Sequence, residues 1–132
     1  MSRQDFDSNL ILVQDIMTKA IISVNIETTV FQVAKMMEQG GIGAVLVKKD
    51  GHLSGIITDR DYATKIVSHN LPSNTPVKQI MSPPLVTIIC DEFISAAAKR
   101  MSSKKIRKLA VTDNGKIIGL ITSTDLVTQL SK

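Results

Sequence analysis

The sequence predicts an α/β fold (α+β in its local arrangement) made of two copies of a strand–helix–strand–strand–helix unit. The chain has 132 residues, and a shift of 64 positions aligns segment 13–66 with segment 77–130 without a gap. One copy of about 55 residues buries little surface by itself. We therefore expect the two copies to pack about a pseudo-twofold axis, as sequence domains 10–69 and 76–131.

Each copy begins with a short apolar strand, expected near 21–24 and near 85–88. A helix follows, because apolar side chains recur at helical spacing in both copies. These side chains are Val30, Val33, Ala34 and Met37, and then Ile94, Ala97, Ala98 and Met101.

A β-hairpin comes next in each copy. The dipeptides Asp50-Gly51 and Asn114-Gly115 predict its turns, since these residue types tolerate positive φ. The flanking strands are expected at 44–47, 53–57, 109–111 and 117–121.

A second helix closes each copy, near 59–67 and 123–130. The polar segment 69–76 between the copies, HNLPSNTP, is typical of a linker. The stretch Gly40–Gly43 lacks the strand-to-helix context of a phosphate loop and is expected to end the first helix.

The residue composition limits the classes of function that this chain can have. Aromatic residues make up 3% of the chain, which argues against stacking of exposed bases as the main activity. Cys90 is the single cysteine, so we expect a buried thiol and a cytoplasmic setting, without an intrachain disulfide. We find neither a targeting segment nor a membrane-spanning run. His52 and His69 have no metal-ligand spacing, and no catalytic constellation is evident, so we expect no enzyme activity.

The same short motif ends the hairpin in both copies. It reads GIITDRD at 55–61 and GLITSTD at 119–125. A Thr at a helix N-cap, with an acidic residue three positions later, is explained by helix capping. The same geometry also suits a ligand: helix N-termini attract phosphate, and a carboxylate can accept from the two hydroxyls of a ribose. Both interpretations stay open, and they are compatible.

The chain resembles a tandem pair of CBS domains, the repeat named after cystathionine β-synthase, in a stand-alone, Bateman-type module. The repeated Ile-Met-Thr/Ser opening, the helix that ends in Met, the Asp/Asn-Gly hairpin and the Gly-to-Asp motif carry the resemblance, over about residues 13–130.

This resemblance implies an adenosine nucleotide as ligand. Asp61 and Asp125 would bind ribose, and Thr58 and Thr122 would lie near phosphate. An adenine pocket would form around the first strand and the start of the second strand. In the first copy its residues would be Thr18, Ile22, Ile42, Gly43 and Ala44, and in the second Ser82, Val86, Ile106, Arg107, Lys108 and Leu109. The aliphatic members of this set are expected to be core residues first.

The two copies differ in charge. Segment 10–69 has six basic and six acidic residues, whereas segment 76–132 has nine basic and four acidic ones. Six of the ten residues in 99–108 are basic. Such a run is usually a solvated face, but Arg107 and Lys108 occupy positions where similar proteins bind phosphate.

The variable pair inside the motif also differs, Asp59-Arg60 against Ser123-Thr124. Asp59 would oppose a polyphosphate, whereas Arg60 could favour one. Ser123 and Thr124 are neutral donors. We therefore expect Thr122 and Asp125, helped by Arg107 and Lys108, to form the stronger site.

The sequence thus predicts a non-catalytic sensor that binds AMP, ADP or ATP, with or without magnesium, in clefts between two CBS domains. It would have no covalent cofactor and would signal to an unidentified protein. We expect a homodimer formed through the helical faces. The alternatives are a basic nucleic-acid-binding protein, favoured by a pI near 9.3, and a structural adaptor with empty clefts.

Overall fold

The computed structural model describes residues 10–19, 21–82 and 86–132. They form two compact units, each with its own three-stranded sheet. One unit comprises Ile22–Pro84 and is called here the β1–β3 unit; the other comprises Met1–Ile21 with Leu85–Lys132 and is called the β4–β6 unit. The strand–helix–strand–strand–helix order predicted for each copy is confirmed.

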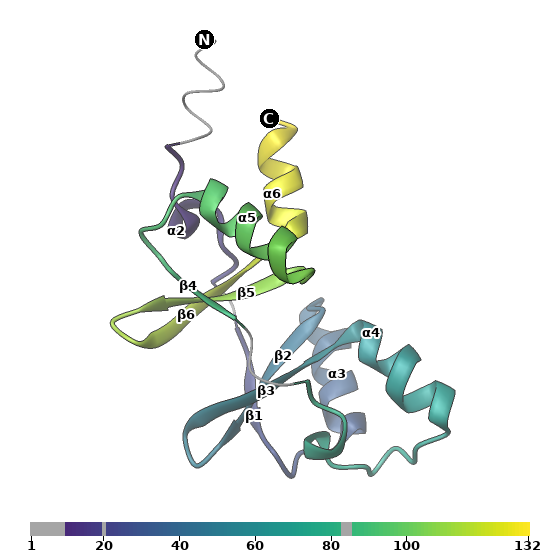
Figure 1. Ribbon diagram of the computed structural model, residues 1–132. Helices are drawn as coiled ribbons and strands as arrows, with labels where there is room; N and C mark the ends of the chain where they lie inside the picture. The colour runs from purple at the N-terminus through teal and green to yellow at the C-terminus, as the bar shows by residue number, and fades with distance from the viewer. Residues whose placement is uncertain (1–9, 20, 83–85) are drawn as a thin grey trace. The chain divides into compact units, whose positions relative to one another are not determined.

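The β1–β3 unit orders its strands β1-β2-β3, with β1 parallel to β2 and β2 antiparallel to β3. Its helix α3 and the helical segment that begins with α4 lie on the same side of the sheet (Figure 1). The elements are β1 (Ser23–Asn25), α3 (Val30–Gly40), β2 (Ala44–Lys49), β3 (His52–Thr58) and α4 (Asp59–Asp61), followed by a π-helical turn (Tyr62–Ile66) and two 3₁₀ turns (Val67–His69 and Val77–Gln79).

The β4–β6 unit repeats this topology in the order β4-β5-β6. Helices α5 and α6 pack against one another beside its sheet (Figure 1). The elements are the short helix α2 (Val13–Ile16), β4 (Thr87–Ile89), α5 (Ile94–Lys104), β5 (Lys108–Asp113), β6 (Lys116–Thr122) and α6 (Ser123–Leu130).

Both predicted hairpin turns are confirmed. Asp50 and Gly51 have φ of 52° and 79°, and Asn114 and Gly115 have the same two values. Gly41 also ends α3 in the left-handed conformation, as expected for the Gly40–Gly43 stretch.

The first strands lie about two residues later than predicted. Strand β1 spans Ser23–Asn25 where 21–24 was expected, and β4 spans Thr87–Ile89 where 85–88 was expected. Leu85 lies outside the described residues. The second helix of the first copy is also less regular than predicted, because the α-helical geometry of α4 gives way to a π turn after Asp61.

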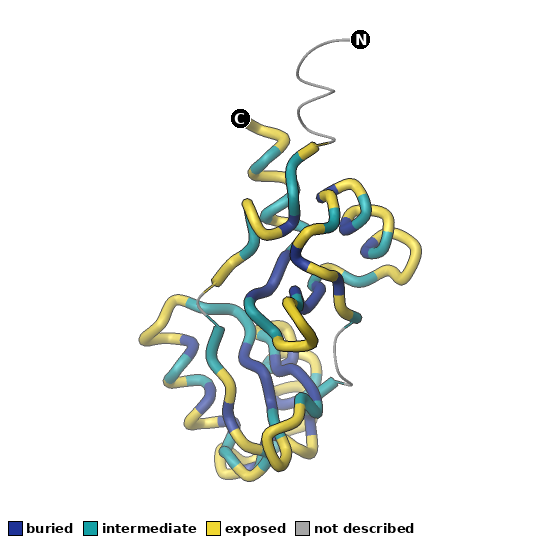
Figure 2. Tube along the Cα trace, turned by 90° about the vertical axis from the view of Figure 1, so that its left-hand side faces the viewer, coloured by how far each residue is buried: buried dark blue, intermediate teal, exposed yellow. Residues whose placement is uncertain are grey.

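Each core lies between a sheet and its helices, and buried residues follow the strands and the inner helix faces (Figure 2). In the β1–β3 unit the core includes Val33, Val45 and Ile57; in the β4–β6 unit it includes Leu109 and Ile121. All five side chains are at most 1% exposed. Cys90 is buried in the second core, as expected, and burial raises the pKa of its thiol.

The segment that opens each copy packs in the unit of the other copy. Val13 of α2 belongs to the core of the β4–β6 unit, and Val77 and Ile80 belong to that of the β1–β3 unit. The sequence domains 10–69 and 76–131 follow the repeat and stay a prediction, whereas the compact units have exchanged these opening segments.

Segment 69–76 connects the two copies, as predicted, and much of it also packs within the β1–β3 unit. The backbone N–H groups of Val30 and Phe31 donate to the carbonyls of Thr75 and Ser73, at 2.9 and 3.1 Å. Thr75 is 5% exposed, and its hydroxyl donates to the carbonyl of Pro72 at 2.6 Å. The segment therefore satisfies the free N–H groups at the start of α3.

Candidate functional site

The second motif, Thr122–Asp125, forms the junction between β6 and α6. Thr122 Oγ1 accepts a hydrogen bond from Asp125 N at 3.1 Å, and Asp125 Oδ2 accepts one from Thr122 N at 2.9 Å. This reciprocal pair is a capping box. The capping interpretation is therefore confirmed for this copy, and it uses only one of the two carboxylate oxygens.

The first motif, Thr58–Asp61, lies at the matching junction between β3 and α4. Asp61 Oδ2 accepts from Thr58 N at 2.8 Å and from the Thr58 hydroxyl at 3.2 Å. The Thr58 hydroxyl thus donates to the carboxylate, whereas the Thr122 hydroxyl accepts from the backbone. Asp61 is 7% exposed and is one of two buried polar or charged residues in the described part of the chain.

Lys65 also contacts the first motif, and the sequence reasoning missed it. Its Nζ lies 3.4 Å from Asp61 Oδ1. It also donates to the carbonyl of Ile80 and to the hydroxyl of Ser82, both at 3.0 Å. The repeat alignment contained a signal for this residue, because the equivalent position in the second copy is Gln129.

Thr18 and Ser82 each lie beside the motif of the other copy. Thr18 exchanges backbone hydrogen bonds with Leu120 of β6 at 2.8 and 2.9 Å, and Ser82 exchanges them with Ile56 of β3 at 3.1 and 3.3 Å. Thr18 is therefore grouped with the second motif and Ser82 with the first. The sequence grouping by copy did not anticipate this exchange.

The residues at the start of β2 and β5 lie next to the motif of their own unit. The carbonyl of Arg107 accepts from Ser123 N at 2.9 Å, and Lys108 is the cross-strand partner of Thr122. The carbonyl of Gly43 likewise accepts from Asp59 N at 3.0 Å, and Ala44 pairs with Thr58. The β4–β6 unit thus places two basic residues beside its motif, where the β1–β3 unit has glycine and alanine.

The aliphatic candidates contribute to the cores. Leu109 is fully buried. The partly buried members of this set pack against the core of the unit that contains them: Ile22, Ile42, Val86 and Ile106. Arg60 and Thr124, the variable residues of the two motifs, are exposed.

Each unit also has an open surface pocket, called a cavity below. In the β4–β6 unit the cavity measures about 270 Å³ and Asp125 is among its lining residues. In the β1–β3 unit the cavity measures about 350 Å³ and Lys65 lines it. The two cavities occupy equivalent positions in the repeat, because four of their lining residues correspond. The pairs are Asp15 and Gln79, Ile16 and Ile80, Met17 and Met81, and Gln129 and Lys65.

Tyr62 follows the first motif directly. Its hydroxyl donates to the carbonyl of Val30 at 2.6 Å. Burial, with a smaller contribution from the Asp61 charge, raises the pKa of Tyr62 to about 12. This hydrogen bond ties the π turn to the start of α3.

No group of three His, Cys, Asp or Glu side chains is placed to hold a metal ion within 10–19, 21–82 and 86–132. Over the same residues, none of the helices combines the length and the apolar character needed to cross a membrane.

The topology and both motifs define a tandem repeat of a known domain. The chain belongs to the CBS domain family, whose model matches residues 13–68 and 77–132. The predicted resemblance is therefore confirmed.

Two relatives are similar to this chain in sequence. The CBS domain-containing protein YhcV of Bacillus subtilis is 32% identical over 120 residues, which cover 90% of this chain and 86% of that protein. The uncharacterized protein MK0525 of Methanopyrus kandleri is 35% identical over 119 residues, which cover 87% of this chain and 60% of that protein.

Solved structures share the fold. A conserved uncharacterized protein from Pyrococcus horikoshii matches with a TM-score of 0.85 and 25% identity, over 94% of this chain and 95% of that one. The CBS domain pair of the protein MJ0100, solved with 5′-methylthioadenosine and S-adenosylmethionine, matches with a TM-score of 0.81 and 27% identity, over 92% of this chain and 97% of that one.

Proposed function

We propose that this CBS pair is a non-catalytic regulatory module that binds an adenosine nucleotide, namely AMP, ADP or ATP, with or without magnesium. The observation that carries the proposal is the position of Asp125. One oxygen of its carboxylate caps α6, while the residue also lines the cavity of the β4–β6 unit. A carboxylate in this position can accept from a ribose diol without leaving its helix cap.

The surroundings of Asp125 supply complementary chemistry. The N-terminus of α6 presents positive dipole charge, and the start of β5 brings the cationic residues Arg107 and Lys108 to the same junction. These features favour a ligand with a negatively charged group. The ligands of MJ0100 support the adenosine part of the proposal; they carry no phosphate, so the phosphate part is supported by the basic residues alone.

Isothermal titration with AMP, ADP, ATP and 5′-methylthioadenosine tests the proposal. We expect binding by the wild-type chain and at least a tenfold loss of affinity in Asp125→Asn, about 1.4 kcal/mol. The control is Asp113→Asn, which removes the same charge from an exposed position in the same unit and should bind like the wild type. The proposal fails if all four compounds leave the wild-type chain unbound, or if Asp125→Asn retains full affinity.

The basic segment 99–108 favours nucleic acid as a second candidate partner. That function predicts binding to a DNA duplex that weakens steeply between about 50 and 200 mM salt. It also predicts that Asp125→Asn binds DNA as well as the wild type does. A filter-binding series at several salt concentrations separates this candidate from the adenosine proposal.

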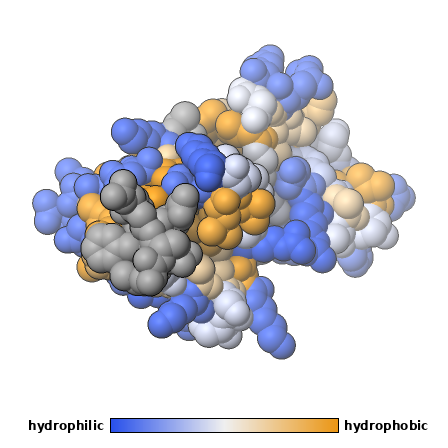
Figure 3. Space-filling model, turned by 90° about the horizontal axis from the view of Figure 1, so that it is seen from above, coloured by the Kyte–Doolittle hydropathy of each residue, from blue (hydrophilic) through white to orange (hydrophobic). Residues whose placement is uncertain are grey.

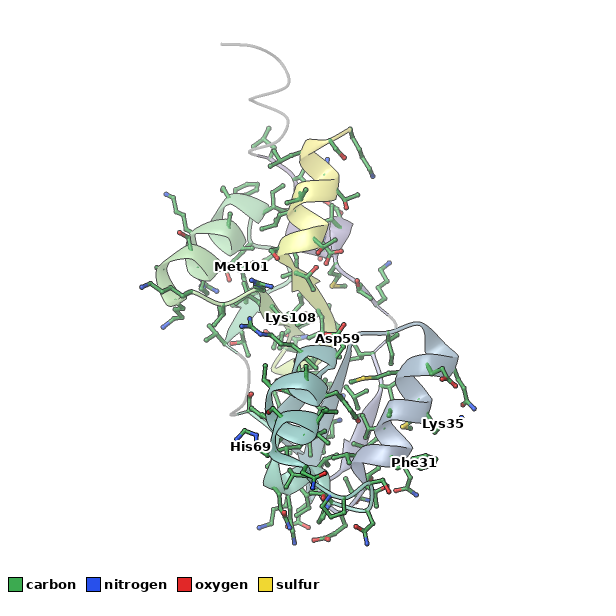
Figure 4. The ribbon with its side chains drawn as sticks, turned by 90° about the vertical axis from the view of Figure 1, so that its right-hand side faces the viewer. Phe31, Lys35, Asp59, His69, Met101 and Lys108 are labelled. Carbon is green, nitrogen blue, oxygen red and sulfur yellow. The ribbon has the colours of Figure 1, made fainter. Side chains whose placement is uncertain are left out.

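We further propose that the module forms a homodimer through helical faces and transmits ligand occupancy to another protein in the cytoplasm. Large apolar side chains are exposed on these faces: Phe31 at 56% and Val67 at 74% in one unit, Val127 at 64% and Leu130 at 75% in the other. Phe31 and Lys35 point outward from α3 (Figure 4), and apolar patches interrupt the hydrophilic surface in Figure 3. Light scattering at micromolar concentration, with and without AMP, tests the dimer; a monomer under both conditions contradicts it.

A further inference from the structure

The two motif carboxylates differ in how many of their oxygens are already bonded. In Asp61, Oδ2 accepts from the N–H and hydroxyl of Thr58, and Oδ1 lies 3.4 Å from Lys65 Nζ. In Asp125, Oδ2 accepts from Thr122 N. Within the described residues, Oδ1 of Asp125 makes neither a hydrogen bond nor an ion pair with another side chain. Asp125 therefore has one oxygen without such a partner, whereas both oxygens of Asp61 have one.

Lys65 causes this difference. Its ammonium group has three donors, and it has three acceptors in reach: Asp61 Oδ1 at 3.4 Å, and the Ile80 carbonyl and Ser82 hydroxyl at 3.0 Å each. The Asp61 side chain is only 10% exposed, and that of Lys65 is 38% exposed. A ligand hydroxyl that displaced Lys65 from Asp61 Oδ1 would therefore separate a partly buried ion pair, which is unfavourable.

The second copy cannot make the same arrangement. Gln129 stands at the position of Lys65, and Thr18 stands at that of Ser82. A neutral amide offers no charge to pair with Asp125. The bond pattern around the second carboxylate is therefore set by one residue difference between the copies.

The cavities agree with this difference. Asp125 and Gln129 both line the cavity of the β4–β6 unit. In the β1–β3 unit, Lys65 lines the equivalent cavity but Asp61 does not. The lysine therefore lies where a ligand hydroxyl would have to approach the first carboxylate.

We propose that Lys65 occupies the ligand-binding carboxylate of the first motif, so that the protein binds one adenosine ligand per chain, through Asp125. Lys65 is a specificity-determining residue that decides which of two repeated motifs binds. This inference rests on the proposed function for its ligand, whereas the pairing of Lys65 with Asp61 can be tested without one.

Reciprocal exchange of the two residues tests the inference. Isothermal titration with AMP and with 5′-methylthioadenosine should give one site per wild-type chain and two sites in Lys65→Gln. Gln129→Lys should lower the affinity of the wild-type site at least tenfold. The control is Lys78→Gln, which removes a lysine of the same unit that pairs with exposed Glu27 and should leave one site of unchanged affinity.

Two results would overturn the inference: two sites in the wild-type chain, one of which is lost in Asp61→Asn, or a single site that persists in Lys65→Gln. Urea unfolding of Lys65→Gln, Asp61→Asn and the double variant measures the pairing independently. We expect the two midpoint shifts to be non-additive, and additive shifts contradict the pairing. If the wild-type chain binds neither probe while the shifts are non-additive, the proposed function and the one-site conclusion fail but the pairing stands.

Discussion

At the scale of single residues, the two copies differ where their first long helices end. Gly41 and Lys105 occupy equivalent positions after α3 and α5, with φ of 61° and 54°. The left-handed conformation suits glycine but strains a residue with a Cβ atom. The second copy therefore contains a backbone strain that the first copy avoids.

Lys105→Gly should raise the free energy of unfolding by about 1 kcal/mol, measured by urea denaturation. The control is Lys104→Gly, which places glycine at the last residue of α5 and should not raise it, because glycine is a poor helix former. A Lys105→Gly variant that is no more stable than the wild type would show that this position is not strained.

Tyr62 offers a second measurement at this scale, because it is the only tyrosine in the chain. Its phenol should titrate near pH 12 in the folded protein, followed by absorbance, instead of near pH 10. Because the folded-state pKa is raised, the corresponding stability is fully present below about pH 10 and is lost as the pH rises toward 12.

Tyr62→Phe removes the hydroxyl that donates to Val30 and should cost about 1 kcal/mol of stability at neutral pH. This variant should also lose the decline in stability between pH 10 and pH 12. A wild-type phenol that titrates near pH 10 in the folded state would contradict the buried hydrogen bond.

At the scale of elements, the repeated glycine of the motif has a packing role. A Cβ atom added to Gly119 of β6 would lie 2.7 Å from the carbonyl oxygen of Thr18 and 2.8 Å from Met17 Sδ. Gly55 of β3 meets the equivalent Ser82 and Met81. The absence of a side chain at this glycine therefore allows the opening segment of the other copy to pack closely against the strand.

Gly119→Ala should destabilise the protein by about 1 to 3 kcal/mol, because the segment around Thr18 must move to make room. Gly40→Ala is the control, since its Cβ would meet only the Ile42 side chain at ordinary contact distance, 3.7 Å, and alanine favours the helix. Thermal unfolding measures the stability of both variants. Equal midpoint shifts in Gly119→Ala and Gly40→Ala would contradict the close approach at Gly119.

Local patterns predicted most elements, because each of them depends on neighbouring residues. The helix at 123–130, both hairpins and the capping role of Thr122 and Asp125 were predicted correctly. The π turn after Asp61 was not, since the residues of 59–67 have an ordinary helical pattern. Lys65 was missed although Asp61 is only four residues away, because its two other partners, Ile80 and Ser82, are distant in sequence.

At the scale of the whole molecule, the repeat in the sequence and the compact units in space divide the chain differently. A gap-free repeat indicates which segments are alike, but not which segments pack together. The exchange of Val13 and Val77 between the cores depends on tertiary contacts that periodicity does not report. It is also the reason that Thr18 and Ser82 lie beside the opposite motif.

The exchange predicts which fragments of the chain can fold. Fragment 22–84 matches one compact unit and contains Val77 and Ile80, which are buried in its core. Fragment 10–69 has nearly the same length but lacks both residues, and it also lacks the carbonyls that accept from the N-terminus of α3. Domains of about 60 residues are marginally stable, so these losses should prevent fragment 10–69 from folding.

In urea titrations followed by circular dichroism, fragment 22–84 should unfold cooperatively and fragment 10–69 should not. Fragment 22–84 carrying Val77→Asp should behave like fragment 10–69, because the substitution buries a charge in that core. Equal stability of 10–69 and 22–84 would mean that the sequence repeat, and not the compact unit, is the folding unit.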